Sequence, residues 1–253
     1  MNQTTLSKMK LMGLYGMHHA FKTAIETGKT DHYTIDQFMA QMIDIEWDDR
    51  QNKKLQRSLR NAQFRQKASL EQVIFNDERN LDRTKLLRLA QGVYIDKGED
   101  VLITGSTGVG KSYLAIALGY QACIEGYKVK YYNTTRMLAR LKIAKSEGNY
   151  LKELAKIERQ QLIILDDFGL HPMDNHSRLA FLEIIEDRHG KGSVIITSQL
   201  PVSKWYDIIG DKTIADATMD RLVHHAHRFE LEGESMRKKK GEIKPDLSMN
   251  LNP

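Results

Sequence analysis

The sequence predicts an α/β protein in which helices cover both faces of a parallel sheet, preceded by a small all-helical region. From Val101 onward, short apolar runs alternate with helical patterns, as expected for parallel strands joined by helices. Residues 5–67 carry helical spacing only, and the chain changes character around residues 68–92. We therefore expect a helical domain over residues 1–67, an α/β domain over 68–245 and a tail over 246–253.

The N-terminal region shows apolar residues at three- and four-residue steps from Leu6 to Ile25, a pattern that Gly28 stops. Thr34 followed by Gln37 fits a capping box for a second helix, whose pattern can continue into the basic segment 50–67. Its methionines and aromatic residues, up to Trp47, are expected to form a small helical core.

Four apolar runs are the expected strands. They are VLIT (101–104), VKYYN (129–133), LIILDD (162–167) and SVIITS (193–198).

The composition limits the cell compartment and the kind of partner. Cys123 is the only cysteine, so an intrachain disulfide is excluded, which suits a reducing cytosol. No run approaches the roughly 18 apolar residues that span a bilayer, and the N-terminus lacks the apolar core of a signal peptide. We expect a cytoplasmic protein without membrane contact, and the net charge of +5 weakly favours a polyanionic partner.

The segment GSTGVGKS matches the phosphate-loop pattern G-x-x-x-x-G-K-[ST] between an expected strand and an expected helix. Its glycines let successive N–H groups point at phosphate oxygens. Lys111 should reach the β and γ phosphates, and the Ser112 hydroxyl should ligate Mg²⁺. The alternative is a chance glycine-rich turn. ATP-binding candidates are Gly105, Ser106, Thr107, Gly108, Val109, Gly110, Lys111 and Ser112.

Acidic and polar residues end the third and fourth expected strands. Asp166 is the expected Mg²⁺ ligand, and Asp167 would orient the attacking water. An acidic pair in this position can also be a helix cap or a turn. Gln199 could sense the γ-phosphate or could simply begin a polar loop.

The segment RQNKKLQRSLRNAQFRQK (50–67) holds seven basic residues among eighteen and no acidic one. On a helical wheel the basic residues, with Phe64 among them, fall within about 160° of arc, opposite Leu55 and Leu59. Without acidic partners at i+4 they cannot neutralise one another, so a phosphate backbone is the expected partner. A solvated face that binds nothing is the alternative. Candidate contacts here are Lys53, Lys54, Arg57, Arg60 and Arg65.

A second basic cluster lies between the second and third expected strands, and basic residues recur after residue 236. Neither offers a pattern that reads base edges, so we expect little sequence specificity. The second set of nucleic-acid candidates is Arg136, Arg140, Lys142 and Lys145.

Taken together, these segments resemble the AAA+ ATPases, within them the DnaC/IstB-like group, and most closely the IstB helper ATPases of IS21-type transposons. The resemblance covers roughly residues 5–245. It is carried by LMGLYGM, the basic segment, GSTGVGKS, IILDDFG, IITSQLPVSKW, ATMDRLVHHA and LEGESMRKK.

The resemblance implies an AAA+ core with Walker A at Lys111 and Ser112 and Walker B at Asp166 and Asp167. It further implies sensor 1 at Gln199, an arginine finger at Arg221 and a sensor 2 position near Arg237. Most AAA+ relatives carry Glu at the position of Asp167 and Asn at that of Gln199, which predicts slow hydrolysis. Arg221 could alternatively be a surface arginine paired with Asp216 or Asp220.

The function that the resemblance implies is that of a homo-oligomeric ATPase that assembles on duplex DNA and presents it to a transposase. Three alternatives stay open. They are a helicase loader acting on single-stranded DNA, a P-loop kinase of small molecules, and a nucleotide-gated scaffold that scarcely hydrolyses ATP.

Overall fold

The computed structural model describes residues 2–28 and 33–236. It divides the chain into two compact units, Met1–Ser58 and Leu59–Pro253. The division falls inside a helix, upstream of the expected boundary at residue 67. Across the part of the chain that is described, no helix combines the length and apolar character needed to cross a membrane.

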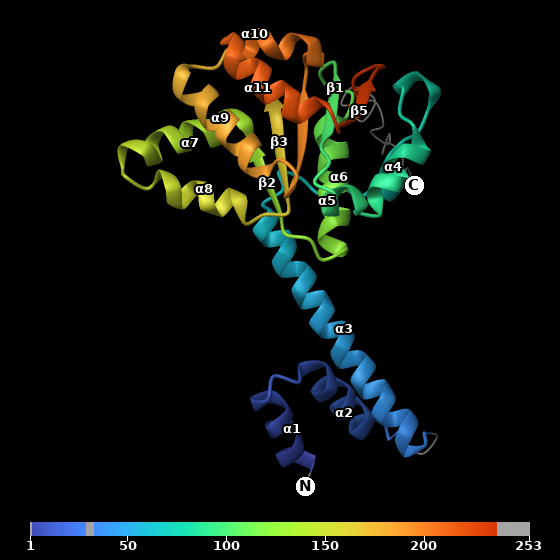
Figure 1. The fold of residues 1–253 in the computed structure, drawn as a ribbon. Coiled ribbons are helices and arrows are strands. Elements are labelled where there is room, and N and C mark those ends of the chain that lie inside the picture. The colour runs from blue at the N-terminus through green and yellow to red at the C-terminus, as the bar shows by residue number, and fades with distance from the viewer. Residues whose placement is uncertain (1, 29–32, 237–253) are drawn as a thin grey trace, which may run out of the picture. The chain divides into compact units, whose positions relative to one another are not determined.

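The N-terminal unit consists of α1 (Asn2–Leu11), α2 (Tyr15–Thr27) and the first part of α3 (Ile35–Ala62) (Figure 1). The helical pattern expected from Leu6 to Ile25 is interrupted, because Gly13 adopts a left-handed conformation between α1 and α2. Gly28 ends α2 as expected.

The capping box at the start of α3 is confirmed. The Thr34 backbone N–H donates to Oε1 of Gln37 at 3.0 Å, and the Gln37 N–H donates to Oγ1 of Thr34 at 3.3 Å. Two backbone donors at this end of the helix are thereby satisfied.

Helices α2 and α3 meet at Gly16, where a Cβ atom would lie 2.6 Å from Cα of Glu46. The buried Glu46 carboxylate accepts from the N–H of Gly16 at 2.8 Å and of Met17 at 3.2 Å, and from Nε of Arg50 at 2.7 Å. Burial alone would raise the pKa of Glu46, but hydrogen bonds from Arg50, Met17 and Gly16 hold the pKa below its usual value.

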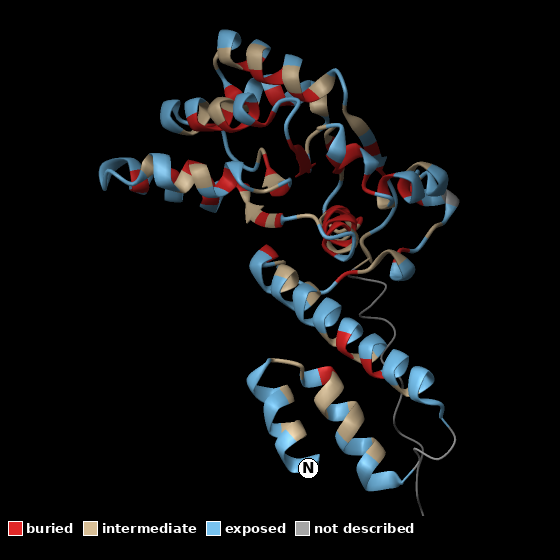
Figure 2. Cartoon of the chain, turned by 60° about the horizontal axis from the view of Figure 1, so that its bottom comes forward, coloured by how far each residue is buried: buried red, intermediate tan, exposed pale blue. Residues whose placement is uncertain are grey.

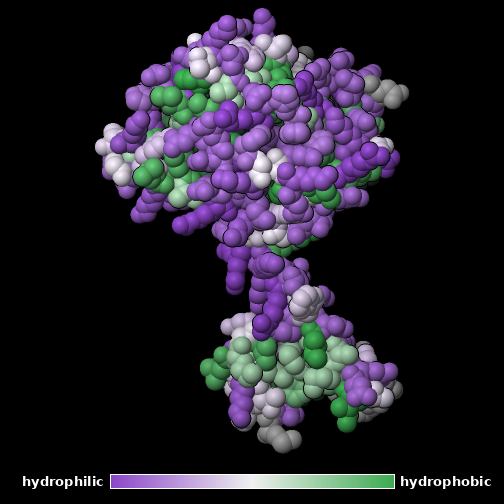
Figure 3. Space-filling view, viewed as in Figure 1, coloured by the Kyte–Doolittle hydropathy of each residue, from purple (hydrophilic) through white to green (hydrophobic). Residues whose placement is uncertain are grey.

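The expected helical core of this unit is only partly present. Met42 is buried, whereas Met39, Ile43 and Trp47 are exposed. Figure 3 shows hydrophobic residues gathered on the surface of this unit. The prediction that the apolar stripe of α3 packs inside was therefore wrong at these three positions, because Glu46, one turn after the buried Met42, occupies the position that contacts Gly16 of α2.

The second unit is built on a parallel five-stranded sheet in the order β2-β3-β4-β1-β5. The strands are β1 (Val101–Gly105), β2 (Val129–Asn133), β3 (Leu162–Phe168), β4 (Ser193–Ser198) and β5 (His227–Leu231). The first four confirm the predicted strands. The fifth was missed, because at this edge only Phe229 and Leu231 are buried and the run HRFEL carries little apolar signal.

Helices cover both faces of this sheet, as predicted (Figures 1 and 2). On one face, Gly119 of α6 (Lys111–Ile124) approaches Ile164 closely. The opposite face packs with the other helices around a core that includes Leu165, Phe181 and Leu222. These helices are α7 (Thr134–Ser146), α8 (Tyr150–Glu158), α9 (Asn175–Arg188), α10 (Trp205–Ile209) and α11 (Lys212–Val223).

A segment of short elements precedes β1. It contains the 3-10 turns η1 (Leu70–Gln72) and η2 (Asp77–Arg79) and the helices α4 (Arg83–Ala90) and α5 (Val93–Asp96); a further turn, η3 (Val202–Lys204), follows β4. Because all five strands are parallel, β1, β3 and β4 end at the same edge of the sheet, where polar residues follow each of them.

Candidate functional site

The phosphate loop connects β1 to α6 and depends on its glycines. Gly105 and Gly108 have φ values of 144° and 88°, and a Cβ atom on Gly105 would collide with the carbonyl oxygen of Leu231. Lys111 is buried, and its ammonium donates to the carbonyl oxygen of Ser106 at 2.8 Å. The lysine therefore lies folded onto the loop at the N-terminus of α6, where backbone N–H groups favour phosphate.

The carboxylate of Asp166 lies at the centre of the site and is fully buried. Its Oδ1 accepts from the hydroxyls of Ser112 at 2.7 Å and Thr197 at 2.5 Å. Its Oδ2 accepts from the hydroxyl of Tyr131 at 2.6 Å. Elements β2, β4 and α6 thus fix one side chain of β3 beside the phosphate-loop serine. The role of Asp166 as a Mg²⁺ ligand stays a prediction.

A β-bulge in β3, which the sequence did not reveal, sets the direction of the Asp167 side chain. Leu165 pairs with Ile196 and Phe168 with Ser198, so Asp166 and Asp167 together oppose Thr197. Asp167 has a φ of 60°, and its N–H donates to Oγ1 of Thr197 at 3.1 Å. In a regular strand, consecutive side chains point to opposite faces, whereas a bulge redirects one of them.

Two side chains lie against the Asp167 carboxylate on the same oxygen. The amide of Asn133 donates to Oδ2 at 3.3 Å, and Nη1 of Arg65 lies 3.7 Å from it. Arg65 was predicted from the sequence as a nucleic-acid contact, and no sequence pattern connected it to Asp167. The sheet order explains Asn133, because it ends β2, next to β3.

Gln199 follows β4 and lies beside the phosphate loop. Its Oε1 accepts from the hydroxyl of Thr107 at 2.8 Å. The Gln199 side chain is thus held against the phosphate loop. Its role in sensing the γ-phosphate stays a prediction.

Arg79 is a site residue that sequence reasoning missed. Its buried guanidinium donates to the carbonyl oxygens of Val109 at 2.8 Å and Ile74 at 2.5 Å, and burial lowers its pKa. It therefore braces the phosphate loop from η2. The N–H of Met236 donates to the carbonyl oxygen of Gly108 at 2.9 Å and adds a second brace. Arg79 stands in no motif, whereas Met236 lies in the segment LEGESMRKK.

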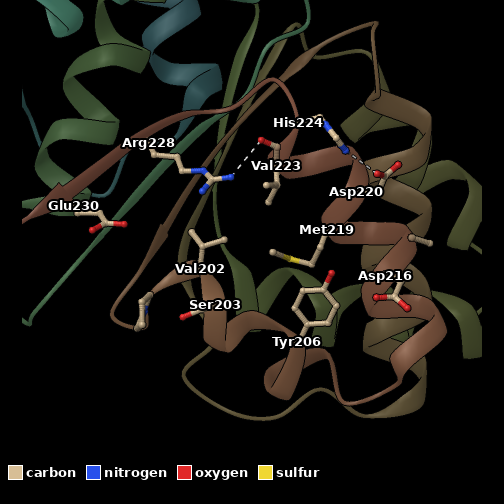
Figure 4. A pocket seen from close by; sticks show the side chains of 12 residues that line it. Val202, Ser203, Tyr206, Asp216, Met219, Asp220, Val223, His224, Arg228 and Glu230 are labelled. Atoms are coloured by element: carbon tan, nitrogen blue, oxygen red, sulfur yellow. Dashed lines mark hydrogen bonds and ion pairs between the residues drawn. The ribbon is translucent and has the colours of Figure 1, made fainter.

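Arg221 lies apart from this cluster, on α11. It pairs with Glu186 at 2.8 Å and donates to the carbonyl oxygen of Ala217 at 2.7 Å. Pairing with Asp216 or Asp220, the alternative considered from the sequence, is wrong. Those two residues line a separate pocket of about 820 Å³, where Asp220 contacts His224 at 3.0 Å (Figure 4). Arg237, the predicted sensor 2 residue, lies outside the described residues.

The basic segment differs from its prediction in two respects. Helix α3 ends at Ala62, so Arg65 does not belong to the helical face. Lys53 pairs with Asp49 at 2.5 Å, so an acidic residue four positions upstream does neutralise part of the stripe. The remaining helical candidates are exposed and form no ion pair with any described residue: Lys54, Arg57 and Arg60.

The second basic cluster lies on α7, and all four of its candidates are exposed. Arg140 pairs with Glu153 at 3.1 Å and Lys142 with Asp174 at 2.7 Å. Lys145 lies over the ring of Tyr150, 5.8 Å from its centroid. Arg136 is at the N-terminal end of the same helix.

A phosphate loop after β1, an acidic pair after β3 and a polar side chain after the intervening β4 define a P-loop ATPase. Solved structures with a similar fold include the DnaC helicase loader, with a TM-score of 0.56 and 20% identity over 65% of this chain and 97% of that chain. They also include the replication initiator DnaA bound to AMPPCP and single-stranded DNA, with a TM-score of 0.57 and 20% identity over 71% of this chain and 56% of that chain. The second unit therefore shares its fold with these two proteins.

The profile of the IstB-like ATP binding protein family matches residues 4–243, and the chain belongs to this family. A putative insertion sequence ATP-binding protein, y4pL, of Sinorhizobium fredii is 44% identical over 92% of this chain and 96% of its own length. The insertion sequence IS21 putative ATP-binding protein of Pseudomonas aeruginosa is 30% identical over 99% of this chain and 94% of its own length. The protein is thus an ATP-binding ATPase.

Proposed function

We propose that this ATPase is a transposition helper that assembles on duplex DNA and presents it to a transposase. The observation that carries the proposal is the similarity along nearly the whole chain to proteins named for insertion sequences. Lys54, Arg57 and Arg60 of α3 support DNA as the partner, because they are exposed and have no ion pair to break with any residue that the structure describes.

Mg²⁺ is the cation that the proposal assigns to the active site. The Ser112 hydroxyl and the Asp166 carboxylate place two oxygen atoms side by side, and oxygen is the ligand type that Mg²⁺ prefers. When bound, the cation would supply neutralisation of charge on the β and γ phosphates. Tyr131 and Thr197 keep the carboxylate turned toward Ser112.

ATP hydrolysis is assigned to the residues around Ser112 and Asp166. Lys111 would bind the β and γ phosphates from the loop, and Asp167 would orient the attacking water. Gln199, held beside Thr107, is suited to contact the γ-phosphate. The shorter carboxylate of Asp167, in place of Glu, is consistent with slow turnover.

Replacing Tyr131 with Phe should weaken Mg²⁺-dependent ATP binding by about tenfold and leave Mg²⁺-free binding unchanged. Without the Tyr131 hydroxyl, Oδ2 of Asp166 loses its hydrogen bond, and the carboxylate can turn away from Ser112. A hydrogen bond to a charged group contributes about 1.5–3 kcal/mol, and about 1.4 kcal/mol is a tenfold change. Burial and the neighbouring Asp166 raise the pKa of Tyr131, so its hydroxyl stays a donor at every working pH.

The measurement is nucleotide affinity in Mg²⁺ and in EDTA, with thermal unfolding as the check on folding. Equal losses of affinity under the two conditions would contradict a role for Tyr131 in holding Asp166.

Arg221 is the residue proposed to act between neighbouring subunits of an assembly. Its ion pair to Glu186 is partly exposed, and among the described residues it makes no contact with the phosphate loop of its own chain. A guanidinium supplied to a neighbouring subunit would make hydrolysis depend on assembly. The proposal is therefore a homo-oligomer in which each subunit completes the site of the next.

The proposed contact between α3 and DNA is tested by replacing Lys54, Arg57 and Arg60 together with Gln. Each phosphate contact contributes a slope of about −0.9 to log affinity against log salt concentration, so the slope should fall in magnitude by about two to three units per engaged subunit. Gln preserves helix propensity. The loss should be similar for unrelated duplexes, because base edges are not read.

The matched control is the exchange of Lys97, Lys191 and Lys204 for Gln, which removes the same charge from exposed positions elsewhere in the chain. It should preserve the slope. If the α3 variant stays folded and keeps the parental DNA affinity and salt slope, these residues form a solvated face and the proposed DNA contact is wrong.

A further inference from the structure

Arg79 places a buried positive charge against the backbone of the phosphate loop. The residue lies in η2 and is 7% exposed. Its Nη2 donates to the carbonyl oxygen of Val109 at 2.8 Å, and its Nη1 donates to that of Ile74 at 2.5 Å. A Cβ atom on Gly110 would lie 2.8 Å from Nη2, so the glycine leaves the room that the guanidinium occupies.

The position of η2 is fixed by β5 and the residues after it. The carbonyl oxygen of Arg79 accepts from the N–H of Glu232 at 3.2 Å, and the Asn80 amide donates to the carbonyl oxygen of Glu230 at 3.1 Å. Strand β5 pairs with β1, and the phosphate loop follows β1. The order of the sheet therefore keeps the guanidinium beside the loop.

The charge of Arg79 is not neutralised by any residue that the structure describes. No described carboxylate pairs with the guanidinium, and its Nε has no hydrogen-bond partner among the described residues. A guanidinium stays protonated at every working pH, and a buried charge without a partner is unfavourable. An anion bound on the other side of the loop would supply the missing counter-charge.

The hydrogen bond to Val109 also sets the direction of one peptide group of the loop. In a planar trans peptide, the C=O of Val109 and the N–H of Gly110 point in opposite directions. Because this C=O points to Arg79, the Gly110 N–H points away from it. N–H groups of such a loop meet phosphate oxygens, and a cation on the carbonyl polarises the peptide and strengthens its N–H as a donor.

We propose that Arg79 is a second cationic determinant of ATP binding besides Lys111, and that it acts on the phosphates through the peptide between Val109 and Gly110. It orients and polarises the Gly110 N–H and adds a positive potential behind it. Because it touches no phosphate, Arg79 is a positioning residue. The inference rests on the proposed placement of the phosphates on this loop, and it requires neither DNA nor a transposase.

The first test is the ATP affinity of Arg79→Gln, which keeps a hydrogen-bond donor and removes the charge. The dissociation constant should rise by about 10- to 100-fold, the range for loss of a hydrogen bond that involves a charged group. Arg88→Gln, which removes an exposed arginine from the nearby α4, is the matched control and should bind ATP like the parent.

Arg79→Lys separates the charge from the shape of the side chain. Burial lowers the pKa of a lysine, so this variant is charged at low pH and becomes neutral as the pH rises. Its ATP affinity should exceed that of Arg79→Gln at about pH 7 and should fall toward it by about pH 10. The parent keeps its charge over this range and corrects for every other group that titrates.

The outcomes separate this inference from the proposed site. Parental affinity in Arg79→Gln would overturn the inference alone if Lys111→Ala still loses ATP. Parental affinity in both variants would show that the phosphates do not lie on this loop.

Thermal unfolding reports whether each variant is folded. If Arg79→Gln does not fold, the pH profile of Arg79→Lys decides. A profile parallel to the parent's would mean that Arg79 supports only the shape of the loop, and it would overturn the electrostatic role.

Discussion

Replacing Lys111 with Ala should reduce ATP affinity by about 100-fold or more. The β and γ phosphates lose the only cation of the phosphate loop, and two charge-assisted hydrogen bonds contribute about 3 kcal/mol or more. The alanine variant also loses the brace to the Ser106 carbonyl. The measurement is calorimetric titration with a non-hydrolysable nucleotide.

Lys191→Ala is the matched control, since it removes an exposed lysine from the same unit. It should bind like the parent. Parental affinity in Lys111→Ala would show that the phosphates do not lie on this loop.

Replacing Asp167 with Asn should preserve ATP binding and slow hydrolysis by about 10²- to 10⁴-fold, the usual range for loss of a general base. The substitution suits the bulge, because Asn tolerates the φ of 60° and the backbone bond to Thr197 remains. Single-turnover hydrolysis and nucleotide affinity, measured on the same sample, separate the two effects. Hydrolysis at the parental rate would contradict the role given to Asp167.

The same variant tests assembly when it is mixed with Arg221→Ala. A mixed interface can combine an intact Arg221 of one subunit with an intact Asp167 of the next, so part of the activity should return. The absence of any recovery, in mixtures shown to contain mixed assemblies, would count against a role for Arg221 between subunits.

Much of the ATPase core was predictable because its signals are local. The apolar run of each central strand and the phosphate loop between Gly105 and Ser112 depend on neighbouring residues, and both were found in place. Asp166 followed from the same logic, as it ends a buried strand. The capping box at Thr34 is local in the same sense.

Features that depend on register or on distant contacts escaped prediction. The bulge at Asp167 exists only in the pairing with β4, and Tyr131 and Arg79 reach the site through the tertiary fold. The end of α3 at Ala62 depends on a left-handed Gln63, a conformation that is uncommon outside glycine. Asp49 did stand four residues before Lys53, so that ion pair could have been found by searching upstream.

We propose that duplex DNA controls this ATPase, and the most direct test is the ATP hydrolysis rate with no DNA, with duplex DNA and with single-stranded DNA. We expect slow turnover alone, a rate several-fold higher with duplex DNA of any sequence, and a smaller effect of single strands. The Lys54, Arg57 and Arg60 variant should lose the stimulation at moderate salt. Stronger stimulation by single-stranded DNA than by duplex DNA would indicate a helicase loader. A hydrolysis rate that neither form of DNA changes would contradict the proposed control by DNA.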